Sequence, residues 1–155
     1  AAEDPIWPVE ELAALADPDG NRVIFVPMGS DGVTQIGVRL VVPDRARSIR
    51  YYRDTLGFAQ EAPGRVRCGD SVLLFEERAD APSGFAQAQR GWLYLTVQVR
   101  DCDAEVARIE AAGGRVVVTP RNLGKVARMG MIRDPDGNLL EVSQRASLTG
   151  PLPDR

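Results

Sequence analysis

The stretch Asp134-Pro135-Asp136-Gly137-Asn138-Leu139-Leu140-Glu141-Val142-Ser143 decides the fold of this 155-residue chain. Proline after aspartate favours a tight turn, glycine takes the left-handed position that closes it, and the following apolar run is a strand. A near copy, Asp17-Pro18-Asp19-Gly20-Asn21-Arg22-Val23-Ile24-Phe25-Val26, lies 117 residues earlier, at position 17 instead of 134. Such self-similarity indicates a module that occurs more than once. The copies differ at the position that matters most chemically, which is Glu141 in one and Ile24 in the other.

The sequence between the two copies begins with a unit over 36–77. Apolar residues spaced three and four apart predict a helix over 46–56, with Asp44 placed to cap its start and Gly57 to end it. Runs of β-branched and apolar residues predict strands around this helix, over 36–42, 58–67 and 71–76.

The same order of elements restarts at residue 92. A helix is predicted over 103–112, ended by Gly113-Gly114, and Asp101 precedes it as Asp44 precedes the first helix. Strands are predicted over 92–99, 115–119, 126–133 and 139–144. The Ala-, Gln- and Gly-rich segment 78–91 is interpreted as a linker or flap between the units.

These patterns predict one domain over 35–145, made of the units 36–77 and 92–144, followed by a loose tail over 146–155. Residues 1–29 are interpreted as the terminal hairpin of a partial or preceding unit. Because a two-stranded hairpin is marginal alone, we expect it to dock on this domain, on a symmetry mate, or within a longer protein.

Composition narrows the function classes. With 19 basic and 22 acidic residues the net charge is −3, which argues against nucleic acid or a membrane surface as a partner. No apolar run reaches membrane-spanning length, and a cytoplasmic location is predicted. The two cysteines, Cys68 and Cys102, lack metal or redox spacing and are expected to be free thiols. The absence of histidine excludes Ser-His-Asp and Cys-His mechanisms.

The segments VPDRARSIRYYRDTLGF (42–58) and IRDPDGNLLEVSQ (132–144) resemble the vicinal oxygen chelate superfamily, which includes glyoxalase I, bleomycin resistance proteins and extradiol dioxygenases. The resemblance covers about residues 35–145. It implies an α+β fold of two βαβββ modules that form an open cupped barrel around a small-molecule site, with the helices outside. It also implies a homodimer or a swap of modules between subunits.

In metal-using relatives, the resemblance places the ligands on the first and last strands of each module. The corresponding positions here are Gly37, Leu74, Tyr94 and Glu141. Divalent metals need three or four nitrogen, oxygen or sulfur donors, and tyrosine is a weak ligand near neutral pH. We therefore expect no metal and no cofactor, with Glu141 as a ligand only if a metal is found.

Strand alternation assigns the two faces of each sheet. If Gly37 and Tyr94 point into the cup, the residues facing it include Arg39, Thr96, Gln98, Glu141 and Ser143. The opposite face, under the helices, is then apolar and consists of Val38, Leu40, Val42, Leu95, Val97, Val99, Leu140 and Val142.

The cup residues support two readings that the sequence leaves open. In the first, Arg39, Tyr94, Thr96, Gln98 and Ser143 bind a small organic ligand, and Arg39 pairs with Glu141 or with the ligand. In the second, Glu141 is the catalytic base of a metal-free or weakly metal-dependent lyase or isomerase, or the chain is one module pair of a larger glyoxalase- or dioxygenase-like enzyme.

The favoured interpretation is a glyoxalase- or bleomycin-resistance-like protein, without metal-dependent glyoxalase or dioxygenase chemistry, that binds a small organic molecule.

Overall fold

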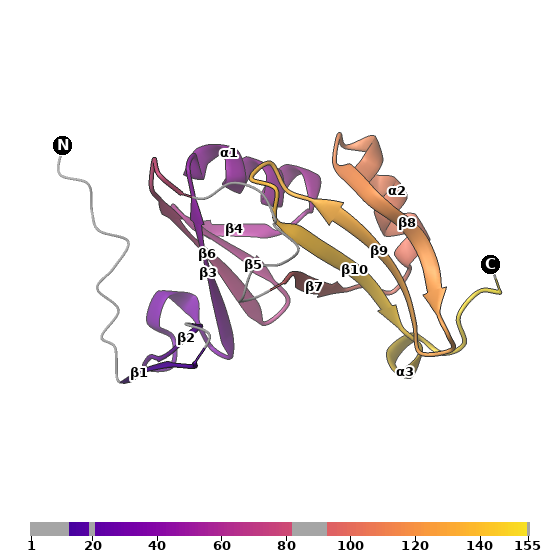
Figure 1. Ribbon diagram of the computed structural model, residues 1–155, viewed down its shortest axis with the longest axis horizontal. Helices are drawn as coiled ribbons and strands as arrows, with labels where there is room; N and C mark the ends of the chain where they lie inside the picture. The colour runs from indigo at the N-terminus through magenta and orange to yellow at the C-terminus, as the bar shows by residue number, and fades with distance from the viewer. Residues whose placement is uncertain (1–12, 19–20, 82–92, 155) are drawn as a thin grey trace.

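The chain forms two four-stranded sheets, covered on one side by helices, and a separate two-stranded hairpin (Figure 1). The computed structural model describes residues 13–18, 21–81 and 93–154. The predicted linker 78–91 lies mostly outside these ranges, as does the start of the predicted hairpin segment 1–29. No helix in the described ranges is long and apolar enough to cross a membrane.

The first module has the order βαβββ. Its elements are β3 (Ile36–Val42), α1 (Arg45–Arg50), the π-helical turn η2 (Tyr51–Thr55), β4 (Ala59–Ala62), β5 (Arg65–Cys68) and β6 (Ser71–Glu77). The strand order is β3-β6-β5-β4, with β3 parallel to β6 and the other pairs antiparallel. The segment 58–67, predicted as one strand, crosses from β4 to β5, because Gly64 turns the chain with φ of 79°.

The second module repeats this arrangement. Its elements are β7 (Leu95–Gln98), α2 (Cys102–Ala111), β8 (Arg115–Leu123), β9 (Ala127–Arg133), β10 (Leu139–Arg145) and the short helix α3 (Ala146–Thr149). The order is β7-β10-β9-β8, and β10 runs parallel to β7. The tail after α3 contacts the module, because Asn122 Nδ2 donates to the Pro153 carbonyl at 2.8 Å. The predicted α+β fold of two βαβββ modules is confirmed; the two mixed sheets do not close into a barrel.

Both principal helices begin at the predicted capping residues. The Asp44 carboxylate accepts a hydrogen bond from Arg47 N at 2.8 Å, and the Asp101 carboxylate accepts one from Ala104 N at 3.0 Å. Each bond satisfies a backbone donor that the first turn of a helix leaves unpaired. An aspartate two or three residues after the end of the first strand therefore starts the helix in both modules.

One hydrophobic core lies under the helices of both modules. The strand residues assigned to this side by alternation either belong to the core or pack against it, which confirms the assignment. Helix residues Ile49, Tyr52, Val106 and Ile109 meet them there. Cys102 is also buried in this core, and the predicted free state of Cys68 and Cys102 is confirmed.

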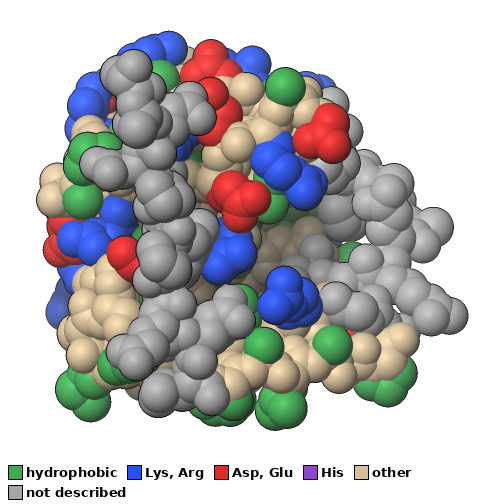
Figure 2. All heavy atoms as spheres, turned by 90° about the vertical axis from the view of Figure 1, so that its left-hand side faces the viewer, with side chains coloured by type: hydrophobic (Ala, Val, Ile, Leu, Met, Phe, Trp, Pro, Cys, Tyr) green, Lys and Arg blue, Asp and Glu red, His purple; other side chains and the backbone are tan. Residues whose placement is uncertain are grey.

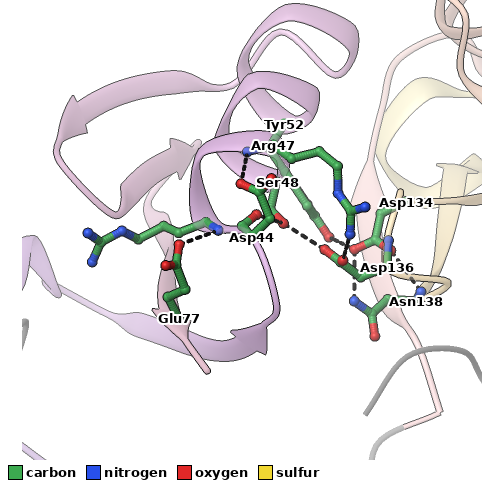
Figure 3. Close-up of polar contacts among 9 residues, drawn as sticks. Asp44, Arg47, Ser48, Tyr52, Glu77, Asp134, Asp136 and Asn138 are labelled. Carbon is green, nitrogen blue, oxygen red and sulfur yellow. Dashed lines mark hydrogen bonds and ion pairs between the residues drawn. The ribbon is translucent and has the colours of Figure 1, made fainter. Parts of the chain in front are cut away.

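The turn between β9 and β10 docks on the first module (Figure 3). Ser48 Oγ donates to one carboxylate oxygen of Asp136 at 2.6 Å, and Arg47 Nη2 donates to the other. Tyr52 Oη donates to Asp134 Oδ2 at 3.0 Å. Both aspartates are buried, at 5% and 4% exposure for Asp134 and Asp136. The modules are thus joined by charge-assisted hydrogen bonds to carboxylates that have left water, which are among the stronger kinds of hydrogen bond in proteins.

We predict that Ser48→Ala destabilises the protein by about 1–3 kcal/mol, because it leaves the buried Asp136 carboxylate without one donor. Equilibrium urea unfolding measures the change. Ser147→Ala is the matched control, because Ser147 is an exposed serine of α3, and it should shift stability by less than about 0.5 kcal/mol. Equal effects of the two changes would contradict the docking role.

The tyrosines beside this turn make stability depend on alkaline pH. Burial, followed by the negative charge of Asp134, raises the pKa of Tyr51 from 10.0 to about 12 and that of Tyr52 well above 10.0. The unfolded chain therefore loses these protons at lower pH than the folded chain. This stability is complete below the ordinary tyrosine pKa and is lost as pH rises through the raised values.

We predict that the free energy of unfolding falls between pH 9 and pH 11, and that it falls less steeply in Tyr52→Phe, which has one fewer shifted phenol. Urea unfolding at both pH values measures the slope. Parallel slopes for the two proteins would show that Tyr52 does not carry this dependence.

Candidate functional site

The cup side of each sheet is defined here as the face opposite the helices. On the second sheet, β10 places Glu141 and Ser143 on this side, two residues apart. Glu141 lies between Thr96 of β7 and Met131 of β9. Ser143 lies between Gln98 and Met129 of the same strands. The sheet therefore brings together four of the predicted site residues, Thr96, Gln98, Glu141 and Ser143.

Two polar side chains at the centre of this face are buried. Glu141 is 9% exposed and Ser143 is 0% exposed. Ser143 Oγ has no hydrogen-bond partner, and among the residues that the structure describes nothing forms a hydrogen bond or ion pair with the Glu141 carboxylate. Buried polar groups in proteins are normally paired, so Ser143 Oγ and the Glu141 carboxylate are exceptions at the centre of this face.

The surroundings of the pair are partly apolar and partly open. Met131 is buried beside Glu141, and Thr96 and Gln98 are exposed at the β7 edge. The Gln98 amide donates to the Ser143 carbonyl at 2.7 Å, which fixes one end of its side chain. Tyr94 lies just before β7 and is 44% exposed, so it is not a core aromatic.

The cup side of the first sheet is strongly charged. Arg39 Nη1 lies 3.6 Å from Glu76 Oε2 on the neighbouring strand β6. Arg65 and Arg67 of β5 both contact Glu61, with Arg67 Nε donating at 2.5 Å. The hydrogen bond from Arg67 is the main reason that the pKa of Glu61 is lowered. This face is suited to anionic groups or to pairing with acidic side chains.

Arg39 therefore has a different acidic neighbour from the one the sequence suggested. The ion pair of Arg39 is made with Glu76, and Glu141 stands on the other sheet. Figure 2, which looks at the end of the molecule where β3 lies in Figure 1, shows basic and acidic side chains intermingled around a hollow. A cross-strand pair within one sheet satisfies Arg39 locally because the side chains on one face of paired strands are neighbours.

Sequence reasoning did not identify Arg65 and Arg67. Their signal is the alternation Arg65-Val66-Arg67, in which Val66 is fully buried and both arginines take the opposite face. The alternation was hidden because the turn at Gly64 was not recognised. Without that turn, β5 is not a separate strand with its own faces.

The four positions that the family resemblance assigns to metal ligands do not form a donor set. A Cβ added at Gly37 would lie 2.8 Å from Val33 Cγ2, so a histidine could not stand there unless Val33 moved. Leu74 is buried and has no donor atom, and Tyr94 is largely exposed. Within the described ranges, no three His, Cys, Asp or Glu side chains are grouped to hold a metal ion. The residues present do not fit the metal that some relatives use.

We predict that Ser143→Ala leaves stability unchanged within about 0.5 kcal/mol or raises it, because the lost hydroxyl is buried and has no partner. Ser48→Ala is the matched comparison, since Ser48 is equally buried but hydrogen-bonded. Both are measured by urea unfolding. A loss above about 1 kcal/mol in Ser143→Ala would show that the hydroxyl has a partner inside the protein.

Comparisons with known proteins agree with this architecture. The family model "Glyoxalase/Bleomycin resistance protein/Dioxygenase superfamily" matches residues 33–142. No curated protein matches the chain.

Solved structures of the same shape include three bacterial proteins. TioX from Micromonospora sp. ML1 is 19% identical with a TM-score of 0.56, covering 71% of this chain and 97% of its own. Lactoylglutathione lyase from Agrobacterium tumefaciens is 24% identical with a TM-score of 0.54, covering 76% and 97%. TnmS3, an antibiotic binding protein from Streptomyces sp. CB03234, is 26% identical with a TM-score of 0.53, covering 70% and 93%.

Three findings agree. The βαβββ order is repeated, the first and last strands of each module pair in parallel, and the family model matches residues 33–142. This chain belongs to the glyoxalase, bleomycin resistance protein and dioxygenase superfamily.

Proposed function

We propose that this protein binds a small organic molecule on the cup side of its second sheet, without a metal ion. The observation that carries the proposal is the buried, unpartnered pair of Glu141 and Ser143. A binding site of this kind combines a largely apolar surface with a few fixed polar groups that orient the ligand. Met131 supplies apolar surface next to the pair.

The chemistry of the pair indicates the kind of ligand. The Glu141 carboxylate accepts hydrogen bonds, so it favours an amine, amidine or amide N–H. The Ser143 hydroxyl can donate to or accept from a second polar group nearby. Tyr94 offers an exposed aromatic ring at the edge of the same sheet, suited to stacking on a planar group. A planar molecule that carries a basic nitrogen meets all three requirements.

Two of the comparisons support a binding role. The family description includes bleomycin resistance proteins, and TnmS3 is described as an antibiotic binding protein. The donor set supports metal independence, because Glu141 is the one strong ligand among the four positions that metal-using relatives occupy. Thr96 and Gln98 remain proposed ligand-binding residues of this site, whereas Arg39, also expected to bind the ligand, stands on the first sheet beside Glu76 and outside this site.

A homodimer fits the open cup. The core that joins the modules lies on the helix side of both sheets, so both cup sides face away from it. A cup then requires a second surface opposite each sheet, and a second copy of the chain is the proposed source.

The alternative function is catalytic, with Glu141 as a general base. The observation in its favour is the same Glu141 carboxylate, which no described residue pairs with and which belongs to a residue that is 9% exposed.

We predict that metal-free bleomycin, or another planar basic antibiotic from a screening panel, binds the protein and that Glu141→Gln weakens binding by about 10- to 100-fold. The expected size follows from the loss of a charge-assisted hydrogen bond. Isothermal titration calorimetry in EDTA measures the affinity. Glu110→Gln is the control, because Glu110 is an exposed glutamate of α2, and its affinity should equal that of the wild type.

Unchanged affinity in Glu141→Gln would contradict the proposed site. Binding that appears only after addition of zinc, nickel or manganese would contradict metal independence. Turnover of the bound compound that is lost in Glu141→Gln would favour the catalytic alternative.

A further inference from the structure

The hairpin of β1 (Ala13–Ala16) and β2 (Arg22–Phe25) is a structural copy of β9–β10. Ala16 pairs with Arg22, just as Arg133 pairs with Leu139 at positions 117 higher. At the far end, Ala13 pairs with Phe25 as Gly130 pairs with Val142. The sequence repeat is thus also a repeat of strand register.

The turns of the two hairpins are closed by the same three hydrogen bonds. In the first copy, Asp17 N donates to the Asn21 carbonyl at 3.0 Å, and Asn21 donates to the Asp17 carboxylate from N at 2.8 Å and from Nδ2 at 2.7 Å. In the second copy, Asp134 and Asn138 make the same bonds at 3.0, 2.8 and 2.8 Å. The first hairpin therefore has the geometry of a complete module end.

The two hairpins differ in burial. Three apolar residues of the second copy are core residues: Ile132 is 1% exposed, Leu140 0% and Val142 1%. Their counterparts in the first copy are open: Leu15 is 60% exposed, Val23 48% and Phe25 51%. What covers the second copy is α2, because Val106 and Ile109 belong to the same core as Ile132, Leu140 and Val142. The same apolar face is therefore buried in one copy and exposed in the other, and exposed apolar faces of this kind often mark interaction sites.

The helices in the described part of the chain do not cover that surface. Figure 1 places β1 and β2 at the opposite end of the molecule from α2. The apolar side chains of α1 and α2 are already buried against their own sheets, so the same helices of a second copy have no free apolar face to offer. By the offset of 117, the counterpart of α2 (Cys102–Ala111) would carry numbers below 1, outside the 155 residues.

We propose that the face formed by Leu15, Val23 and Phe25 docks against a strand–helix–strand unit of a third βαβββ module, which lies outside residues 1–155. The helix of that unit carries aliphatic residues spaced as Val106 and Ile109 are in α2. It covers β1–β2 in the way that α2 covers β9–β10. The N-terminal hairpin is then the last hairpin of that third module.

The repeat itself supplies a probe. Because Ala1 corresponds to Val118 by the offset of 117, a copy of residues 93–117, which contains β7, α2 and the start of β8, can be placed directly before Ala1 of the full chain. Hydrogen–deuterium exchange then compares this extended chain with the original. The expected result is at least 100-fold slower exchange of β1–β2 amides in the extended chain.

The matched control carries Val106→Asp and Ile109→Asp in the added copy alone, which removes the apolar face of the added helix. Exchange of β1–β2 should return to the rate of the original chain. No slowing in the extended chain, or equal slowing in the control, would overturn the proposal.

A second measurement tests a second copy as the occupant. Light scattering compares the mass of the original chain with that of Val23→Asp/Phe25→Asp, together with its thermal unfolding midpoint. Both are expected to be unchanged, because this face is open in the free chain. A fall in mass would overturn the proposal and identify the hairpin as a contact between copies.

Discussion

The docking of the Asp134–Asn138 turn on α1 is the constraint on which the rest of the arrangement depends. Two aspartates leave water at the point where the modules meet, and their cost is offset by donors from Ser48, Arg47 and Tyr52. Any other placement of the modules would remove a donor and leave a buried carboxylate with too few hydrogen bonds. The contact therefore specifies one relative placement of the modules. The aromatic packing of Tyr52 on Phe75, with ring centroids 5.1 Å apart, holds the phenol in position.

This way of joining the modules determines which faces of the two sheets stay outside the shared core. Because the shared core lies on the helix sides, the cup sides of both sheets stay outside it. The first carries arginines paired with Glu61 and Glu76, whereas the second carries the unpaired Glu141 and Ser143. The arginines of the first face are in ion pairs within the sheet, although Arg65 Nε makes no hydrogen bond, whereas Glu141 of the second face has no ion pair among the described residues. That difference is why the proposed ligand site is placed on the second sheet.

The same turn sequence occurs twice, once packed against another part of the protein and once without such packing among the described residues. At 134–138 it is held by a neighbouring helix, and at 17–21 it closes an otherwise similar hairpin whose apolar side is exposed. A turn motif therefore specifies local geometry, whereas its contribution to stability depends on what packs against it. Ile24 in the place of Glu141 shows that the two copies also differ on the face opposite these apolar residues.

Local patterns determined much of this protein from sequence alone: the repeat, both capped helices, the alternation of faces and the module order, because each depends on residues close together in the chain. The placement of Glu141, Ser143, Thr96 and Gln98 on one face followed from the same alternation. Tertiary structure alone decided that Arg39 pairs with Glu76, that Val33 occupies the space beside Gly37, and that Ser143 lacks a partner. These facts depend on which strands lie side by side and on how the sheets pack. Contacts between residues that are distant in sequence cannot be inferred from the local spacing of apolar and polar residues.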